Sequence, residues 1–376
     1  MLKGVHITLM IGPGVAVPVP QSVMDALISI QVTSGKDRSG FQLTFAVAKE
    51  SPLLKVMLPA GYFDPVITRV IIIATVNGTP NVLMDGMITR QELSPSNEPG
   101  QSTFTVTGED LSILMDIVEV PFMRYPAMPE VARLYVMLAK YLVFGIVPLV
   151  IPPIPPDVPI PTREIPAHLG GTDRAYIQRL AREAGYVFYI EPGPAPGQSI
   201  AYFGPDVRIP VPQPALNINM DAHTNVESMT FSLNGLEKKI FIYTILDPIT
   251  GKVPIPIPVP NISILRPPLG ARLTPPAKVQ FAKQGAALSP TKAVQTILGM
   301  TFNASDAITV SGSLDVVRYG RALKSRMMVG VRGAGLAYDG LYYVNSVTHN
   351  IKRGEYKQNF QLSRDGLIAN TPRVPV

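Results

Sequence analysis

The chain of 376 residues contains no cysteine and only four histidines. The absence of cysteine excludes disulfide bonds, thiolate metal ligands and thiol nucleophiles. The histidines are far apart in the sequence, and none falls in an HExxH or comparable metal-binding pattern; they are His6, His168, His223 and His349. The sequence therefore predicts no metal site, and no cofactor is expected.

Charged residues are also scarce. They make up 16% of the chain and hydrophobic residues 46%, against a usual charged share of about 25%. Unusually much of the surface must then be apolar or uncharged, which favours a chain that buries surface against partners. The net charge of +6 is scattered, without a long Lys/Arg run, so specific nucleic-acid binding is not expected. The length fits two or three domains.

Patterns of catalytic residues are missing too. No Gly-x-Ser-x-Gly nucleophile elbow is present, and the glycine-rich stretches 12–14 and 330–335 lack phosphate-loop spacing. His223 and Glu227 are four residues apart, as a metal pair on a helix would be, but their neighbours predict a strand. Asp173 and Glu183 would lie about 15 Å apart along one helix, beyond the separation of about 5 to 9.5 Å that a glycosidase needs. The sequence thus predicts that the protein is not an enzyme.

One apolar stretch, 131–151, has about the length of a bilayer span. Arg133 and Lys140 lie within it, Gly145 ends it and Pro148 blocks its continuation, so membrane insertion is not expected. A mostly buried helix over 129–144 is predicted instead. The first ten residues lack the apolar core of a signal peptide, so general secretory export is not indicated.

Proline, in contrast, is abundant, with 39 residues. It alternates with Val and Ile over 147–161 and 253–260, and returns after Arg266. This alternation excludes a helix or an interior strand and predicts extended, polyproline-like arms. Because the arms are apolar, they are expected either to lie along another surface or to act as stiff spacers.

Residues 1–111 have a β pattern. Apolar and polar residues alternate over 41–48, and Asn77-Gly78 is a hairpin turn between two further strands. Five or six short strands separated by turn residues predict a small barrel or sandwich; the candidates are 5–9, 29–32, 41–48, 68–76, 82–89 and 103–107. A short helix is predicted over 109–119.

The stretch 171–191 predicts a helix followed directly by a strand. Thr172 and Asp173 can cap the helix, and Gly185 can end it. The apolar positions Tyr176, Ile177, Leu180 and Ala184 recur at helical spacing. The aromatic and β-branched run 186–190 then predicts a strand.

Further strands are predicted on both sides of an excursion, which indicates one β domain with an insertion. The strand candidates are 199–203, 216–220, 226–233, 239–246, 308–311, 327–331, 341–350 and 356–363, and 289–298 is a predicted helix. The predicted fold class is α+β, mainly β, with two small barrel-like domains. The predicted boundaries are 1–111 for the first β domain, 112–200 for an α/β domain carrying the arm 147–161, 201–245 with 305–368 for the second β domain, 246–304 for the insertion, and 369–376 for a tail.

Two segments resemble the phage late control protein D family, which includes the baseplate hub of contractile phage tails and the hub part of the VgrG proteins of type VI secretion. The first is the helix and strand of 173–190; the second runs from DGLYYV at 339–344 to FQLSR at 360–364. The positions that carry the resemblance are Asp173, Tyr176, Arg179, Leu180, Gly185, Phe188, Asp339, Gly340, Tyr343, His349, Gly354, Phe360 and Arg364.

The resemblance implies a structural baseplate hub. It implies a homotrimer whose subunits each give two barrel-like tube domains, so that a pseudo-six-fold ring adapts a hexameric inner tube to a trimeric spike. Only twelve residues follow Arg364, so the spike is expected to be a separate protein. Other baseplate proteins are expected as further partners, with assembly in the bacterial cytoplasm and a final place in a phage tail or injection particle.

Two other interpretations stay open at this stage. One is a cell-wall (peptidoglycan) active enzyme on a β scaffold, which would need a carboxylate pair or metal site. The other is a membrane-anchored, β-rich adhesive protein in which 131–151 inserts.

Overall fold

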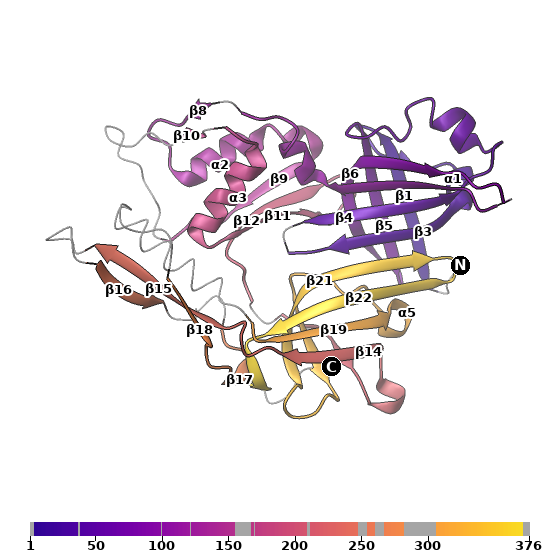
Figure 1. The fold of residues 1–376 in the computed structure, drawn as a ribbon. Coiled ribbons are helices and arrows are strands. Elements are labelled where there is room, and N and C mark those ends of the chain that lie inside the picture. Colours follow the sequence, from indigo (N-terminus) through magenta and orange to yellow (C-terminus); the bar gives the residue numbers. More distant parts are fainter. Residues whose placement is uncertain are drawn as a thin grey trace.

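The computed structural model describes residues 4–36, 38–98, 100–120, 122–154, 167–168, 170–208, 211–246, 254–259, 267–281 and 306–370. Strands account for 49% of the structure and helices for 16%, which confirms the α+β, mainly β class. Figure 1 shows two β regions beside each other, an α/β unit against the first of them, and a small sheet that projects from the second.

The first β region is built from strands with alternating burial, as in β4, where every second side chain is buried. Its elements are β1 (Val5–Pro13), β2 (Val17–Pro18), α1 (Gln21–Ala26), β3 (Leu27–Ser34), β4 (Ser39–Ala46), the π-helix η1 (Leu53–Met57), β5 (Thr68–Val76), β6 (Thr79–Ser94) and β7 (Thr103–Asp110).

The α/β unit follows. It contains the 3-10 turn η2 (Leu111–Met115), β8 (Met123–Arg124), α2 (Glu130–Ala139), the 3-10 turn η3 (Leu142–Phe144), β9 (Ile146–Val150), β10 (Ala167–His168), α3 (Asp173–Ala184), β11 (Val187–Pro192) and β12 (Ser199–Gly204). Thr172 caps α3 and the left-handed Gly185 ends it, as predicted.

Two predicted helices of this unit are corrected. The helix over 109–119 is reduced to one 3-10 turn after Asp110, because the bridge between Glu119 and Thr172 then draws the chain into extended structure. The helix over 129–144 ends at Ala139, and a 3-10 turn leads to Gly145.

The second β region consists of β13 (Gln213–Asn217), the 3-10 turn η4 (Asp221–His223), β14 (Val226–Leu233), β19 (Ile308–Asp315), α5 (Val316–Tyr319), β20 (Met328–Arg332), β21 (Gly340–Lys352) and β22 (Glu355–Arg364). A further strand, β23 (Gly366–Ala369), pairs with β17 (Gly270–Leu273).

Both β regions belong to one 13-stranded sheet, joined where β21 pairs with β3. The pairing pattern occurs twice in this sheet: β3-β4-β7-β6-β5-β1 matches β14-β19-β22-β21-β20-β13. The matched strands also follow one another in the same chain order. One difference is that β1 runs antiparallel to β5, whereas β13 runs parallel to β20. Within the described residues the sheet forms no closed barrel.

The excursion between β14 and β19 forms a separate sheet of order β16-β15-β18, from β15 (Lys239–Leu246), β16 (Pro254–Val259) and β18 (Lys278–Phe281). Residues 239–246, expected in the second β domain, thus pair within the excursion instead. The prediction of polyproline-like arms is also corrected, because 146–150 and 254–259 are strands. Both are edge strands, the position in a sheet that tolerates proline. The predicted helix 289–298, residues 155–161 of the first arm and 371–376 of the tail lie outside the described residues.

Two main cores hold the fold. One runs through both β regions and includes Phe45, Phe104, Tyr342 and Phe360. The other packs α2 and α3 against β9, β11 and β12. None of the helices in the described part of the chain has both the length and the apolar character that a membrane span needs.

Candidate assembly surface

Eight consecutive strands, β14-β19-β22-β21-β3-β4-β7-β6, share one face on which hydroxyl and amide side chains predominate; β6 contributes Arg90, Glu92 and Ser94 to it. Strand registers place on this face, which we call the polar wall, Ser228, Thr230, Ser232, Thr309, Ser311, Ser313, Gln361, Asn359, Ser346, Thr348, Asn350, Ser29, Gln31, Thr33, Gln42, Thr44, Thr103, Thr105 and Thr107. The opposite face supplies the core, because alternate residues of a strand point to opposite sides.

Side chains of the polar wall pair across strands. The Gln31 amide donates to Asn350 Oδ1 at 3.1 Å, and the hydroxyls of Thr33 and Thr348 lie 3.2 Å apart. Both contacts cross from β3 to β21, so the wall is continuous between the two β regions.

Most of the few charges at the margin of the wall are paired; among the described residues Lys352, opposite Ser29, forms no ion pair. Lys357 Nζ lies 2.9 Å from Glu227 and 3.2 Å from Glu355, and Arg90 pairs with Glu92. The wall therefore presents little net field of either sign.

The two ends of the wall are open strand edges. Among the described strands, β14 pairs only with β19. Asn234 N–H donates to Ala307 at 2.9 Å, which turns the peptide groups of Met229, Phe231 and Leu233 outward. At the other end, Thr89 to Ser94 of β6 pair only with β7.

The strand that matches β6 is not open. Its counterpart β21 pairs with β3 from Val347 to Lys352, and β3 is the counterpart of β14. Within the chain, β21 and β3 thus form the junction for which the matching edges, β6 and β14, have no described partner.

The two β regions also share one packing contact, a Phe ring over a Gly, in which the two residues have changed strands. A Cβ at Gly108 of β7 would lie 2.3 Å from the ring of Phe41, which is its partner in β4. A Cβ at Gly312 of β19 would lie 2.6 Å from the ring of Phe360, its partner in β22. The matched strand pairs thus use the same ring-over-glycine contact with the residues swapped.

The positions that carry the family resemblance fall into two groups, which the structure does not bring together; most are buried, whereas Arg179 and Gly354 are exposed. In the first, Asp173 accepts hydrogen bonds from Lys140 and, at 2.7 Å, from the Tyr141 hydroxyl. Tyr176 stacks on His168 at 4.6 Å, and burial lowers the pKa of that imidazole. Arg179 lies over Tyr176, Leu180 and Phe188 are in the core of this unit, and Gly185 ends the helix.

In the second group, Arg364 is fully buried and binds three carbonyls. Its guanidinium donates to Gly366 at 2.7 Å and to Asp339 and Ala337 at 2.8 Å. Gly340 lies against this site, where a Cβ would come within 2.4 Å of Ala369. Gly354 makes the turn between β21 and β22, and Phe360 is in the core.

Two further members of the second group are also buried. The Tyr343 hydroxyl donates to Asp206 at 2.6 Å, and burial together with that carboxylate raises the pKa of the phenol. His349 Nδ1 lies 2.7 Å from the Tyr356 hydroxyl, and burial lowers the pKa of His349 to about 4. These contacts hold helices, strands and loops in place, and Lys140, Arg179 and the turn at Gly354 reach the surface.

The candidate chemical pairs do not form sites. His223 is exposed at η4, and Glu227 pairs with Lys357 instead. Asp173 is buried beside Lys140, whereas Glu183 is exposed and pairs with Arg179. In the described ranges, no three His, Asp or Glu side chains converge as they would around a metal ion.

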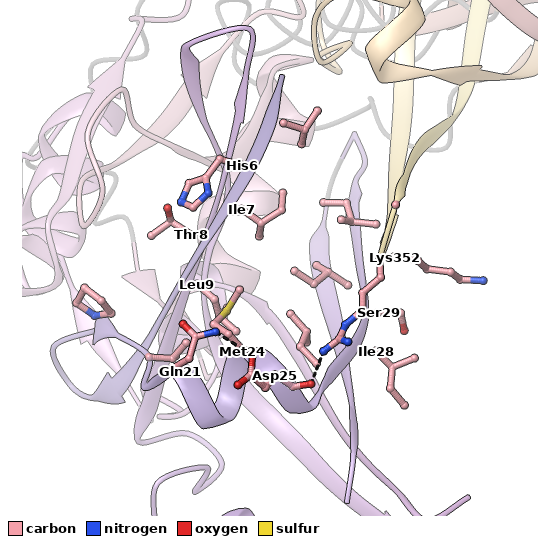
Figure 2. Close-up of a pocket in the computed structure, with 18 residues that line it drawn as sticks. His6, Ile7, Thr8, Leu9, Gln21, Met24, Asp25, Ile28, Ser29 and Lys352 are labelled. Atoms are coloured by element: carbon pink, nitrogen blue, oxygen red, sulfur yellow. Dashed lines mark hydrogen bonds between the residues drawn. The ribbon is translucent and has the colours of Figure 1, made fainter. Parts of the chain in front are cut away.

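A groove of about 630 Å³ lies between β1, α1 and β3. Figure 2 shows His6 to Leu9 on one side, Gln21, Met24 and Asp25 of α1 at its end, and Lys352 opposite. Its lining is mainly aliphatic, and its polar contacts, such as Arg353 Nη2 to the Asp25 carbonyl at 2.5 Å, join the two β regions. The groove contains no arrangement of acid, base and nucleophile.

Sequence reasoning missed the polar wall. The signal was present as alternation of Ser, Thr, Asn or Gln with apolar residues in 29–34, 103–107, 309–313 and 346–350. That alternation gives the exposed face of each strand, but only the pairing shows that the faces are continuous.

No protein-family model matches the sequence, and no curated protein matches it either. Solved structures do match. A tail protein from Neisseria meningitidis MC58 has a TM-score of 0.59 at 12% identity, covering 96% of this chain and 98% of that one. The 43 kDa tail protein of prophage MuSo2 from Shewanella oneidensis gives 0.59 and 12%, covering 96% and 100%.

A structure of the Francisella PdpA-VgrG complex matches with a TM-score of 0.60 at 9% identity. It covers 100% of this chain, which spans 60% of the matched chain. These identities establish the fold alone, and membership of the late control protein D family stays a prediction. The expected resemblance is thus confirmed at the level of structure. The chain has the fold of phage tail proteins and of the matched chain in the PdpA-VgrG complex.

Proposed function

We propose that the protein is the structural hub of the baseplate in a contractile tail or contractile injection system. In this proposal three copies close into a ring, and the polar walls together line its channel. The observation that carries the proposal is the repeated strand pattern, because each chain supplies two four-stranded units of wall, β14-β19-β22-β21 and β3-β4-β7-β6.

The ring would be closed by strand pairing between copies. β6 of one copy would pair with β14 of the next, as β21 pairs with β3 within the chain. In the part of the chain that the structure describes, both edges carry backbone groups without a strand partner, which a neighbouring strand can satisfy. Three chains with two matched units each then give six units with pseudo-six-fold symmetry.

A pseudo-six-fold ring suits a hexameric inner tube on one side, and its true three-fold symmetry suits a separate trimeric spike on the other. Other baseplate proteins would bind the outer surface, where large apolar side chains such as Val143 and Leu336 are exposed. Assembly is expected in the bacterial cytoplasm. The low charge of the polar wall supports a channel rather than a binding site.

The test is the mass of the purified chain by size exclusion with light scattering, alone and with spike protein, followed by electron microscopy of the complex. A trimer with a central channel is expected. A chain that stays monomeric with both tube and spike proteins would contradict the proposal.

A further inference from the structure

Prolines occupy outward positions on several strands that end a described sheet. A hydrogen-bonded pair of an antiparallel ladder exchanges two N–H···O bonds, and proline has no N–H. A proline in an edge strand must therefore direct its donor-free peptide nitrogen away from the neighbouring strand. Such an edge offers carbonyls but lacks donors for another strand.

The clearest case is β16, the outer strand of the excursion. Pro254, Pro256 and Pro258 pair with Leu246, Thr244 and Ile242 of β15. The donors of this ladder must then come from the intervening Ile255, Ile257 and Val259. The whole outer edge of β16 is left without an N–H at any outward residue.

In β9 the outward edge is interrupted once: Pro148 is its middle outward residue, and Ile146 and Val150 on either side keep outward N–H groups. Ile151 N–H donates to Phe203 at 2.8 Å, and Gly145 accepts from Ser199 N–H at 2.9 Å. Odd-numbered residues therefore face β12, and Pro148 faces outward. In β2, Val19 N–H donates to Leu9 at 3.1 Å, so the preceding Pro18 faces outward too.

The two ends of the polar wall differ from these edges. β14 and the 89–94 part of β6 contain no proline. Among the other described edges, β1 faces the groove of Figure 2 and β11 ends in Pro192. The rest belong to strands of five residues or fewer, to the start of β6, which contains Pro80, or to the last four residues of β15, beyond its pairing with β18.

We propose that the edge prolines restrict strand pairing between copies to the outer edges of β14 and β6. The partner for these two edges is a second copy of this chain. The assignment of the partner rests on the proposed function, whereas the blocking of β2, β9 and β16 does not. The proline arms would then limit unwanted growth of the sheets.

The test restores donors to the blocked edges. Pro148→Val and the double variant Pro256→Val/Pro258→Val are compared with Pro194→Val, which makes the same change in a bend outside any ladder. We expect the edge variants to shift to larger, concentration-dependent assemblies in size exclusion with light scattering, while the control keeps the wild-type size. Urea midpoints measured in parallel identify variants that associate only because they unfold.

A complementary variant blocks an open edge. Leu233→Pro removes an outward N–H of β14, and Leu233→Val is its matched control. Loss of self-association in the proline variant alone is expected. Folded edge variants that keep the wild-type size would overturn the proposal that the prolines block strand pairing. If the wild-type protein is a monomer and the edge variants form larger assemblies, the blocking role is supported and the proposed trimer is refuted.

Discussion

At the scale of single residues, Arg364 connects the end of the last long strand to two loops. Arg364→Ala would remove the buried guanidinium that donates to three carbonyls, of which that of Ala337 also accepts from the backbone N–H of Ile368. It would also open a cavity beneath Tyr342, so we expect a loss of about 3 kcal/mol in the free energy of unfolding. Urea denaturation measures this loss. Arg318→Ala, at an exposed position of α5, should change it by less than about 0.5 kcal/mol.

His349 should make stability depend on pH. Its amide neighbour Gln358 is fixed by two bonds to Leu323, accepting from the N–H and donating to the carbonyl, so Gln358 can only donate to His349 Nδ1. The imidazole is thus held neutral, with a pKa lowered from 6.5 to about 4 by burial.

Because the folded pKa is below the unfolded one, the unfolded chain takes up the proton first as pH falls. Stability is then full above about pH 6.5 and decreases toward pH 4, by up to about 3 kcal/mol from this group. His349→Gln should flatten this dependence in urea titrations at several pH values, whereas the exposed His223→Gln should leave it intact. Equal slopes for wild type and His349→Gln would contradict this role.

At the scale of elements, helix α3 depends on its first turn. Thr172 Oγ1 accepts from Ala175 N–H at 3.2 Å and donates to Asp116 at 2.7 Å. We expect Thr172→Ala to lower the free energy of unfolding by about 1 to 2 kcal/mol. The exposed strand residue Thr230, changed to Ala, is the control, with an expected effect within about 0.5 kcal/mol. Equal losses in the two variants would argue against the cap.

Elements with a strong local pattern could be predicted from sequence. The bounds of β5, β14 and β15 agree with the predicted strands, and α3 has both of its predicted caps. β16 was missed because alternating proline also fits a polyproline arm, and only its distant partner β15 makes it a strand. Two β domains of similar build were expected, but no repeat was visible in the residues, because Phe and Gly exchange places in the contact that the two regions share.

At the scale of the whole molecule, assembly should depend little on salt. The polar wall carries few charges, and most of those at its margin are paired within the chain, so screening should remove little attraction between copies. We expect the trimer fraction from light scattering to stay nearly constant as sodium chloride is raised. A steep fall with salt would instead indicate an interface held by ion pairs.

The excursion between β14 and β19 takes the position of the short turn that joins β3 to β4 in the other β region. Only one of the two repeats carries it. A closed circle of three chains would therefore display three identical appendages at alternate positions rather than six. Partner proteins with threefold symmetry could bind all three projections at once, whereas a sixfold partner would meet a projection at only every second position.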